Sequence, residues 1–431
     1  MTSAPSKTAS GPPYLRGLSA LRGLMSRPLA SYYLLLASSG LLLIIGLVMV
    51  FSATMVKAYE EEGNAFSAIV RQSVWALVGL VAFWLAQRLS TRTYRRIGQP
   101  LLLIAAILSL ILVLLPASKG GAFGTDDQWI NVGGFQFQPS EIMKFAFLLW
   151  AAAVLVKAGP KIGLWRELAV PLFPVAAVCF LLVGLSDLGT MLVLVALFLG
   201  LVWMAGVRFR VFAAMLGTAA AAAMVLTLVA DRRMGRIVSF RDPEAHADDW
   251  GYQAIQGYYA IADGGWFGVG LGESRQKWEW LPNGHNDFIF ALIAEELGVV
   301  GCVVVLVLFM VLTYSGMRIA SRVDDPFRRL AAAGLTVWIS AQAIINIGGV
   351  VGLLPITGLP LPLISDGGTA LVVTLAAVGM LASFARAEPD AARALWARNP
   401  GRLARLLWAP LPARREPGGS DDGRSGRVEE S

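Results

Sequence analysis

The sequence predicts an all-α integral membrane protein with about ten transmembrane helices. Only 15% of the 431 residues are charged and 56% are hydrophobic, whereas ordinary soluble domains carry about 25% charged residues. Apolar runs close to the roughly 20 residues that span a bilayer recur through most of the chain. These observations indicate one membrane domain, although length alone would suggest two or three soluble domains.

Ten apolar segments are predicted to cross the membrane, and polar or basic loops separate them. In chain order they are Tyr32–Ala53, Ala68–Gln87, Gln99–Leu115, Ser140–Lys157, Leu168–Leu185, Asp187–Gly206, Val211–Ala230, Asn286–Tyr314, Leu330–Leu354 and Ser365–Ala385.

Basic residues gather in alternate loops and fix the expected orientation. They are Arg88, Arg92, Arg95 and Arg96, then Lys157, Lys161 and Arg166, then Arg208 and Arg210, and finally Arg318, Arg322, Arg328 and Arg329. The positive-inside rule places these loops and both termini in the cytoplasm. The large loop between the seventh and eighth spans, residues 231–285, is then extracytoplasmic. The net charge of +7 is therefore read as loop charge and not as nucleic-acid binding.

Three regions follow from this topology. Residues 1–30 form a cytoplasmic basic N-terminal segment, and no cleavable signal peptide is evident. Residues 31–386 form the polytopic membrane domain. Residues 387–431 form a cytoplasmic, largely disordered tail, whose first part would alternatively lie on the inner leaflet through apolar residues such as Trp396. The chain has only two histidines, which excludes a histidine-rich metal site. Its two cysteines both lie in apolar runs, which excludes a disulfide framework.

Three external pieces are polar or irregular: residues 117–139, 231–285 and 352–368. In the third, Pro355, Pro360 and Pro362 forbid a regular helix, yet the segment is too apolar for a free loop, so it must pack on protein or line a cavity. At the end of the first, Ser140 is expected to cap the fourth span. Glu141 and Lys144 share one helix face there.

The stretch around which the chain is organised runs from Trp250 to Gly301. It is polar, aromatic and glycine-rich, and it leads into a long apolar helix with Asp287 at the junction. A charged side chain at the end of a membrane helix is costly, so it is expected to serve a function. We therefore expect Asp287 to act as a general base, with a pKa that burial raises and that a nearby Lys144 lowers. The alternative is an aspartate favoured by the helix dipole.

Five motifs in order resemble the SEDS family (shape, elongation, division and sporulation). They are W-G-Y-Q-A-I-Q-G, G-G-W-F-G-V-G-L-G-E-S-R-Q-K, L-P-N-G-H-N-D-F-I-F-A-L-I-A-E-E-L-G, G-G-F-Q-F-Q-P-S-E-I-M-K and G-L-L-P-I-T-G-L-P-L-P-L-I-S-D-G-G. The resemblance covers roughly residues 32–385, and its pattern is more similar to the FtsW-like division branch of actinobacterial type than to the RodA-like elongation branch.

The resemblance implies a peptidoglycan glycosyltransferase that polymerises lipid II and releases undecaprenyl pyrophosphate. It also implies a class B penicillin-binding protein and other divisome proteins as partners, and a location in the plasma membrane at the septum. The family's essential aspartate corresponds to Asp287, and its Gln-Pro-Ser-Glu and lysine correspond to Gln138–Glu141 and Lys144. Some positions depart from the family pattern, including Asp366, Leu185-Ser186, Asn283-Gly284, Asn286 and the arginine-free stretch Gly124–Gln128.

A pyrophosphate leaving group needs cationic help. The candidates are Arg232, Arg233, Arg236, Arg241, Arg275 and Lys277, and a divalent cation, Mg²⁺ or Mn²⁺, would serve the same purpose. Each of these side chains is alternatively an ordinary solvated loop charge at the lipid surface.

Gln138, Glu141 and Lys144 either orient Asp287 and contact substrate or only stabilise their helix. Structural roles are favoured for Glu295, Glu296 and His285. The aromatic residues are expected to anchor the membrane interface, with sugar stacking as the alternative; they are Trp250, Tyr252, Tyr258, Tyr259 and Trp266.

Three other functions remain open from the sequence. The first is a transporter that flips lipid II, the second is an elongation-type polymerase, and the third is a non-catalytic scaffold of the divisome. A base-like carboxylate at the outer surface favours the enzyme, because a flippase would spread polar groups through the membrane depth.

Overall fold

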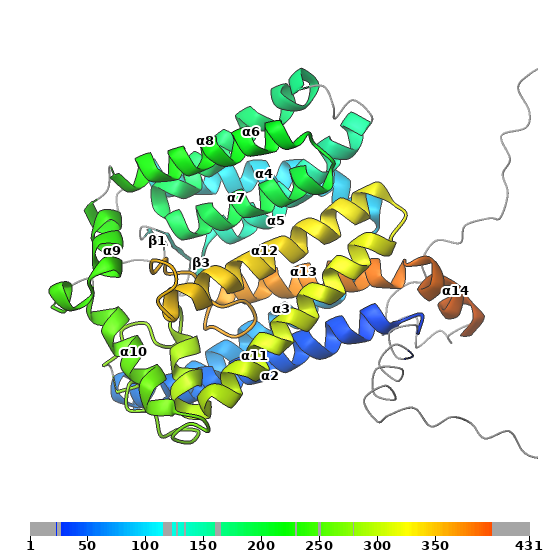
Figure 1. Cartoon of the computed structure of the whole chain (residues 1–431). Coiled ribbons are helices and arrows are strands. Elements are labelled where there is room, and N and C mark those ends of the chain that lie inside the picture. Colours follow the sequence, from blue (N-terminus) through cyan, green and yellow to red (C-terminus); the bar gives the residue numbers. More distant parts are fainter. Residues whose placement is uncertain are drawn as a thin grey trace, which may run out of the picture.

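The computed structural model describes residues 23, 27–114, 123–125, 128–132, 135–159, 165–228, 231–248, 251–278 and 280–398. The predicted N-terminal segment lies almost wholly outside these residues, as does the tail beyond residue 398. The helices (Figure 1) are α2 (Ala30–Glu62), α3 (Ser67–Arg88), α4 (Thr91–Leu114), α5 (Pro139–Ala158), α6 (Trp165–Ser186), α7 (Leu188–Met204), α8 (Phe209–Leu228), α9 (Asp231–Arg241), η2 (Glu244–His246), α10 (Tyr252–Gly264), α11 (Ile289–Arg322), α12 (Pro326–Val350), α13 (Gly368–Arg386) and α14 (Pro389–Arg398).

Seven helices of the described chain are long and apolar enough to cross a membrane: α2, α3, α4, α8, α11, α12 and α13. Two shorter apolar helices are Val170–Ser186, within α6, and α7. The ten predicted segments lie largely within α2 to α8 and α11 to α13. The sequence therefore predicts the helical membrane architecture, whereas α2 and α11 extend well beyond their predicted ends, to 33 and 34 residues.

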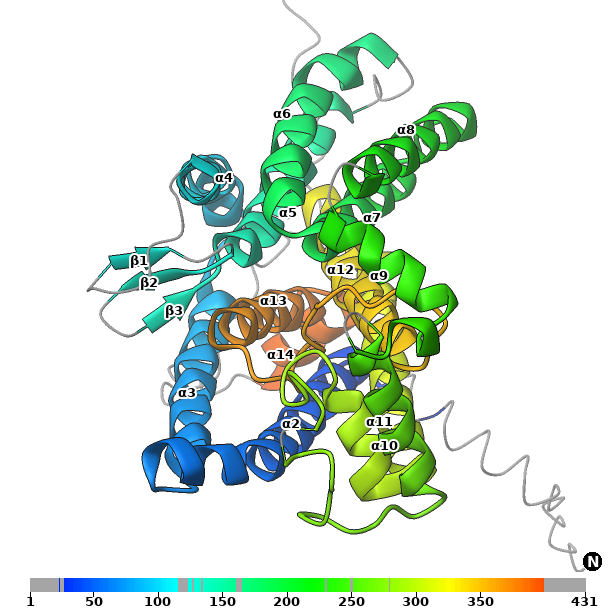
Figure 2. The same ribbon diagram turned by 90° about the vertical axis from the view of Figure 1, so that its left-hand side faces the viewer.

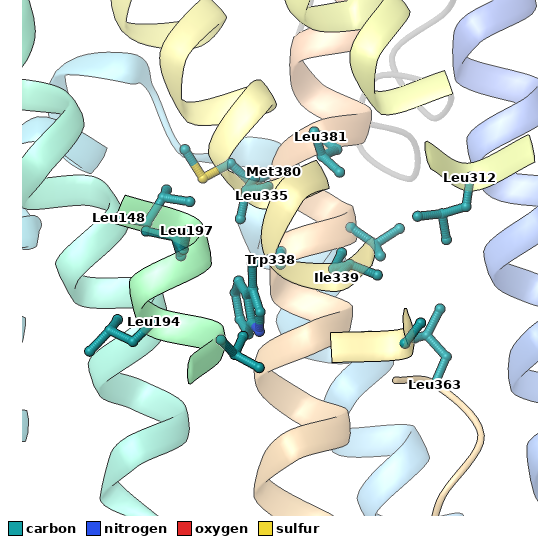
Figure 3. Close-up of a cluster of buried hydrophobic side chains, with 14 of the residues drawn as sticks. Leu148, Leu194, Leu197, Leu312, Leu335, Trp338, Ile339, Leu363, Met380 and Leu381 are labelled. Atoms are coloured by element: carbon teal, nitrogen blue, oxygen red, sulfur yellow. The ribbon is translucent and has the colours of Figure 1, made fainter. Parts of the chain in front are cut away.

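The core lies where α12 passes between its neighbours. Trp338 is 1% exposed and is surrounded by leucines of α5 and α7, with Met380 and Leu381 of α13 on another side (Figure 3). Most of the apolar stretch of α12 is buried against its neighbours. The same central helix carries the residues that hold the candidate site.

The irregular parts gather at one end of the bundle, as the end-on view shows (Figure 2). They include α9, α10 and a small antiparallel sheet in the order β1-β2-β3. The strands are β1 (Phe123–Thr125), β2 (Ile130–Val132) and β3 (Phe135–Phe137). The segment 352–367 has no helix, and its Leu359, Leu361 and Leu363 are buried. The expectation that this apolar segment packs on protein is confirmed.

The predicted cap of the fourth span is wrong. Helix α5 begins at Pro139, and Gln138 occupies the N-cap position without a side-chain hydrogen bond. Proline is favourable at the first helical position because it lacks a backbone N–H, and an N–H at this position would have no partner within the helix. Ser140 therefore lies inside the first turn, and its Oγ has no hydrogen-bond partner among the described residues.

Helix α11 is interrupted at Gly298, which has φ 69° and ψ −166°. The segment 265–270 fills the interruption. The amides of Val269 and Gly270 donate to the carbonyls of Glu295 and Glu296, and the amides of Val299 and Val300 donate to the carbonyls of Gly265 and Trp266. Buried backbone groups that a helix break leaves without an intrahelical bond need such partners.

Two glycines of G-G-W-F-G-V-G, Gly264 and Gly268, are required by this close approach. A Cβ at Gly268, where φ is +78°, would overlap the carbonyl of Glu296, and a Cβ at Gly298 would overlap the backbone of residues 266–268. The motif therefore forms a backbone-to-backbone junction between the large loop and α11.

Candidate active site

Asp287 lies in the turn immediately before α11, at the end of the molecule where the loops gather. Its side chain is 8% exposed, and Oδ1 has no hydrogen-bond partner among the described residues. A buried oxygen without a partner is costly. It is therefore a candidate to receive a proton or a donor from a substrate.

Three consecutive carbonyls hold the backbone of this turn. The carbonyl of His285 accepts from the amide of Asp366 at 3.1 Å. The carbonyl of Asn286 accepts from the Ser365 hydroxyl at 2.5 Å. The carbonyl of Asp287 accepts from the Asn346 side chain at 2.7 Å. The position of the carboxylate is thus set by α12 and the segment 352–367, which lie far from it in sequence.

Two amide side chains one turn apart on α12 make this connection. Asn346 Nδ2 also donates to the carbonyl of Leu359 at 2.6 Å, and Gln342 Nε2 donates to the carbonyl of Pro360 at 2.9 Å. Both amides are buried. They satisfy the backbone of a proline-containing segment that has no regular hydrogen-bond ladder of its own.

Arg236 is the cation that α9 brings to Asp287. Its Nη1 donates to the carbonyl of Thr357 at 3.3 Å. A Cβ on Gly358 would lie 3.7 Å from this Nη1 and 3.9 Å from Asp287 Oδ2, so the two charged groups border the same glycine. Gly358 has φ +75°, a conformation that suits glycine.

Burial raises the pKa of Asp287 to about 7. Its own backbone N–H, Arg236 and the side chain of Gln253 partly offset this. The predicted direction is confirmed, but the opposing cation is Arg236 and not Lys144. A pKa near neutrality is suited to a general base, which must be deprotonated and still accept a proton readily.

Lys144 is engaged elsewhere. Its Nζ donates to Glu141 Oε1 at 2.7 Å and to Gln342 Oε1 at 2.8 Å, and the lysine is fully buried. Trp338 Nε1 also donates to the Gln342 oxygen at 3.0 Å. A buried ion pair needs such additional hydrogen bonds. Glu141 and Lys144 thus reach the site only indirectly, through Gln342 and the segment that Gln342 holds.

The remaining predicted residues are spread over several places. Gln138 Nε2 lies 3.4 Å from Gln128 Oε1. Arg241 is exposed at the end of α9. Arg232 and Arg233 lie in the first turn of α9, which begins at Asp231, and the structure does not describe their side chains.

Glu295 holds the segment that carries Arg275 and Lys277. Its carboxylate accepts from the hydroxyl of Ser274 and from the amides of Arg275 and Gln276. The Arg275 side chain is exposed, whereas Lys277 is buried and its Nζ donates to the carbonyl of Gly272. Glu296 accepts from Ser52 of α2. The structural role expected for both glutamates is confirmed.

His285 faces Asp366, the carboxylate noted as a departure in the sequence. Burial raises the pKa of Asp366, and His285 and Arg71 partly offset this. Burial lowers the pKa of His285, and Asp366 opposes that effect. The two side chains therefore interact electrostatically between the turn before α11 and the segment 352–367.

Sequence reasoning missed Asn346, Gln342 and Ser365. The first two are amides four residues apart within an otherwise apolar span, and polar residues in membrane helices usually serve a purpose. That spacing is a signal that marks one face of α12. The partner carbonyls carried no such signal, because any residue supplies a backbone carbonyl.

Among the described residues, no group of three or more histidines, cysteines or carboxylates is arranged to hold a metal ion. Mg²⁺ commonly binds through one or two carboxylates plus substrate phosphates, so the divalent cation expected from the sequence stays a prediction.

The fold and the site together define a polytopic helical membrane protein with a buried carboxylate at one end of the helix bundle. The family model described as "Cell cycle protein", which takes in FtsW, RodA and SpoVE, matches residues 32–389, and the chain belongs to this family.

One relative is the probable peptidoglycan glycosyltransferase FtsW of Mycobacterium tuberculosis, 44% identical over 405 residues that cover 94% of this chain and 77% of the relative. Two solved structures are similar in fold. RodA of Thermus thermophilus has a TM-score of 0.60 at 25% identity, covering 82% of this chain and 96% of RodA. A chain of a peptidoglycan synthase complex, solved to describe the structural coordination of polymerization and crosslinking, has a TM-score of 0.66 at 27% identity and covers 82% and 97%.

Proposed function

We propose that this protein is a peptidoglycan glycosyltransferase that polymerises lipid II, with Asp287 as the general base. The observation that carries the assignment is a buried carboxylate with a pKa of about 7, one oxygen of which has no partner among the described residues. The relative named as a probable peptidoglycan glycosyltransferase supports the reaction class.

The chemistry requires one base and one displacement. The acceptor sugar's 4-hydroxyl attacks the anomeric carbon of the donor, and its proton passes to the Asp287 carboxylate. The bond between this carbon and the diphosphate oxygen breaks, and undecaprenyl pyrophosphate leaves. A single displacement converts the α-linkage into the β-1,4 bond. A positioned base contributes on the order of 10²–10⁴-fold to such a step.

Arg236 is suited to the leaving group, because the residue is exposed and its guanidinium borders Gly358, as the Asp287 carboxylate does. Planar guanidinium groups bind phosphate oxygens through two parallel hydrogen bonds. Arg275 is exposed in the same large loop. Lys277 fits this role less well, since its ammonium is already bound to the Gly272 carbonyl.

The site would work at the outer membrane face. In this proposal ten helices cross the membrane, both termini are cytoplasmic, and the loop 231–285 is extracytoplasmic. The alternation of basic loops supports this orientation. The similarity to a chain of a peptidoglycan synthase complex supports a cross-linking partner, which we propose is a class B penicillin-binding protein. The division septum as the place of action is part of the proposal.

The test is lipid II polymerisation by the purified full-length protein in liposomes, with and without that partner and with Mg²⁺ or EDTA. Wild-type protein should yield glycan strands, and Asp287→Asn should yield none while retaining its melting temperature or exceeding it. Strands from both proteins would exclude Asp287 as the base. Lipid II translocation without strands from either protein would favour the flippase, and neither activity would favour the scaffold.

A further inference from the structure

A cluster of large apolar side chains is exposed on the segment 266–280 of the large loop. Its members, with their exposed fractions, are Trp266 at 72%, Phe267 at 83%, Leu271 at 57%, Trp278 at 58% and Trp280 at 60%. Exposed apolar surface of this kind marks an interaction site. None of these side chains is needed for the contacts that hold Asp287.

The level of this segment along the bundle is fixed by two neighbouring helices. Its backbone pairs with α11 at residues 295–300. Gly272 lies beside Met55 of α2, and Ser52 of α2 binds Glu296. The lengths of α2 and α11 therefore give two independent estimates of where the cluster lies along the bundle.

Both helices have one end near Glu388, at the opposite end of the bundle. Glu388 lies 3.8 Å from Arg322, at the end of α11. Burial raises the pKa of Glu388, and the neighbouring Ser31 hydroxyl, at the start of α2, is the first group that offsets this. Ser31 and Arg322 therefore lie at the same level.

The lengths of the two helix segments agree with each other and with the thickness of a bilayer. Ser31 to Met55 spans about 36 Å, and Arg322 to Val299 spans about 35 Å, at 1.5 Å per helical residue. The hydrocarbon core is about 30 Å thick, and the polar interface adds several ångströms on each side. If Glu388 lies at one interface, the exposed cluster lies at the other.

We propose that the segment 266–280 is an interfacial anchor that inserts Trp266, Phe267 and Trp278 into the headgroup region of the leaflet next to the Asp287 site. Tryptophan is the residue preferred at this depth, because its ring is apolar and its N–H is polar. Arg275, exposed between these aromatics, can reach lipid phosphates. The anchor follows from the level of the loop and holds whichever reaction the site performs.

The anchor would also explain why the junction at Gly298 joins backbone to backbone. Four backbone hydrogen bonds tie this loop to α11, so the depth of the loop follows that of the helix.

The test measures the depth of single labels in the full-length protein, reconstituted in nanodiscs without any partner. Starting from Cys179→Ala/Cys302→Ala, the fluorophore bimane is attached at Phe267→Cys or Trp278→Cys. The loop control is Glu244→Cys in η2, which is exposed in the same large loop. The membrane control is Val303→Cys, 50% exposed on α11. Quenching is compared for headgroup-region nitroxide lipids and for aqueous iodide.

Labels at 267 and 278 should be quenched several-fold more by the nitroxide lipids than the label at 244, and should be shielded from iodide. Equal access of iodide to 267, 278 and 244 would overturn the proposal. Shielding that appears only after a class B penicillin-binding protein is added would also overturn it, and would identify the cluster as a protein interface. Melting temperatures of the labelled variants exclude misfolding.

Discussion

The side-chain amide of Asn346 donates hydrogen bonds to the carbonyl oxygens of both Asp287 and Leu359, at 2.7 and 2.6 Å. One side chain of α12 thus fixes the turn that carries the candidate base to the irregular segment 352–367. The carboxylate of Asp287 takes no part in this contact. The base is held by its backbone, and its Oδ1 stays available.

Asn346→Ala should lower kcat by about 10²-fold with little change in KM, because displacements of ~1 Å in a catalytic group cost about that much. The variant leaves two carbonyls unsatisfied, so its melting temperature should fall as well. The assay is lipid II polymerisation at several substrate concentrations. Ile344→Ala, 66% exposed on the same helix, is the matched control. A folded Asn346→Ala protein with normal kcat would contradict the positioning role.

The pH dependence of polymerisation should show an acid limb near pH 7, since Asp287 must be ionised to act and its pKa is about 7. The positive charge of Arg236 lowers this pKa, so Arg236→Gln should move the limb to higher pH. Rates measured from pH 5.5 to 9 provide the comparison, with Arg241→Gln on the same helix as the control. An identical limb in Arg236→Gln would show that the two groups are not coupled.

Asp287→Asn should stabilise the protein at neutral and alkaline pH. Burial raises the Asp287 pKa from 3.8 to about 7, so the folded state binds the proton more tightly than the unfolded state, and stability is lost as pH rises through this range. The loss is roughly 4 kcal/mol above pH 7, at about 1.4 kcal/mol per pKa unit. The difference in melting temperature between Asp287→Asn and wild type should therefore be larger at pH 8 than at pH 4.5. A variant that melts below wild type at pH 8 would refute the calculation.

Lys144→Met should destabilise the protein strongly, by about 3–5 kcal/mol, because it leaves the Glu141 carboxylate buried without its cation. The double variant Glu141→Gln/Lys144→Met should recover much of the melting temperature. If Lys144 acts only through structure, the double variant should also recover polymerisation. Restored stability without restored activity would instead indicate direct contact with substrate.

Gly268→Ala should prevent stable folding, since the new Cβ would overlap the Glu296 carbonyl at a position with φ +78°. Gly265→Ala separates the two effects, because φ there is +50° but no atom would lie within 4 Å of the added Cβ. We expect a modest loss of melting temperature for Gly265→Ala and a much larger loss of folded protein for Gly268→Ala, measured by size-exclusion yield. Similar yields of the two variants would mean that the segment 265–270 and α11 can move apart at Gly298 without loss of folding.

The helices and the site aspartate were accessible from the sequence for a simple reason. Apolar run length is a local property, and Asp287 stands out as a charge beside such a run. The first turn of α5 was predicted less well, because Pro139 and Ser140 both suit a helix start and only the structure decides between them.

The support of Asp287 was not accessible in this way. It comes from Asn346 and Ser365 meeting backbone carbonyls that lie 59 and 79 residues away in sequence, and nothing local marks those carbonyls. The expected proximity of Lys144 failed for the same reason. Its position on α5 was right, but Gln342 and Glu141 are closer partners than the aspartate.

The interruption of α11 has a mechanical consequence. Around Gly298, backbone groups of α11 form hydrogen bonds with the loop segment 265–270. The short helix that follows Asp287 is therefore not continuous with the rest of α11, which is long enough to cross the membrane. Membrane helices tilt to match the local thickness of the bilayer. We therefore expect Gly298 to take up a tilt of the part of α11 that follows it. The geometry around Asp287 should then be the same in thin and thick membranes.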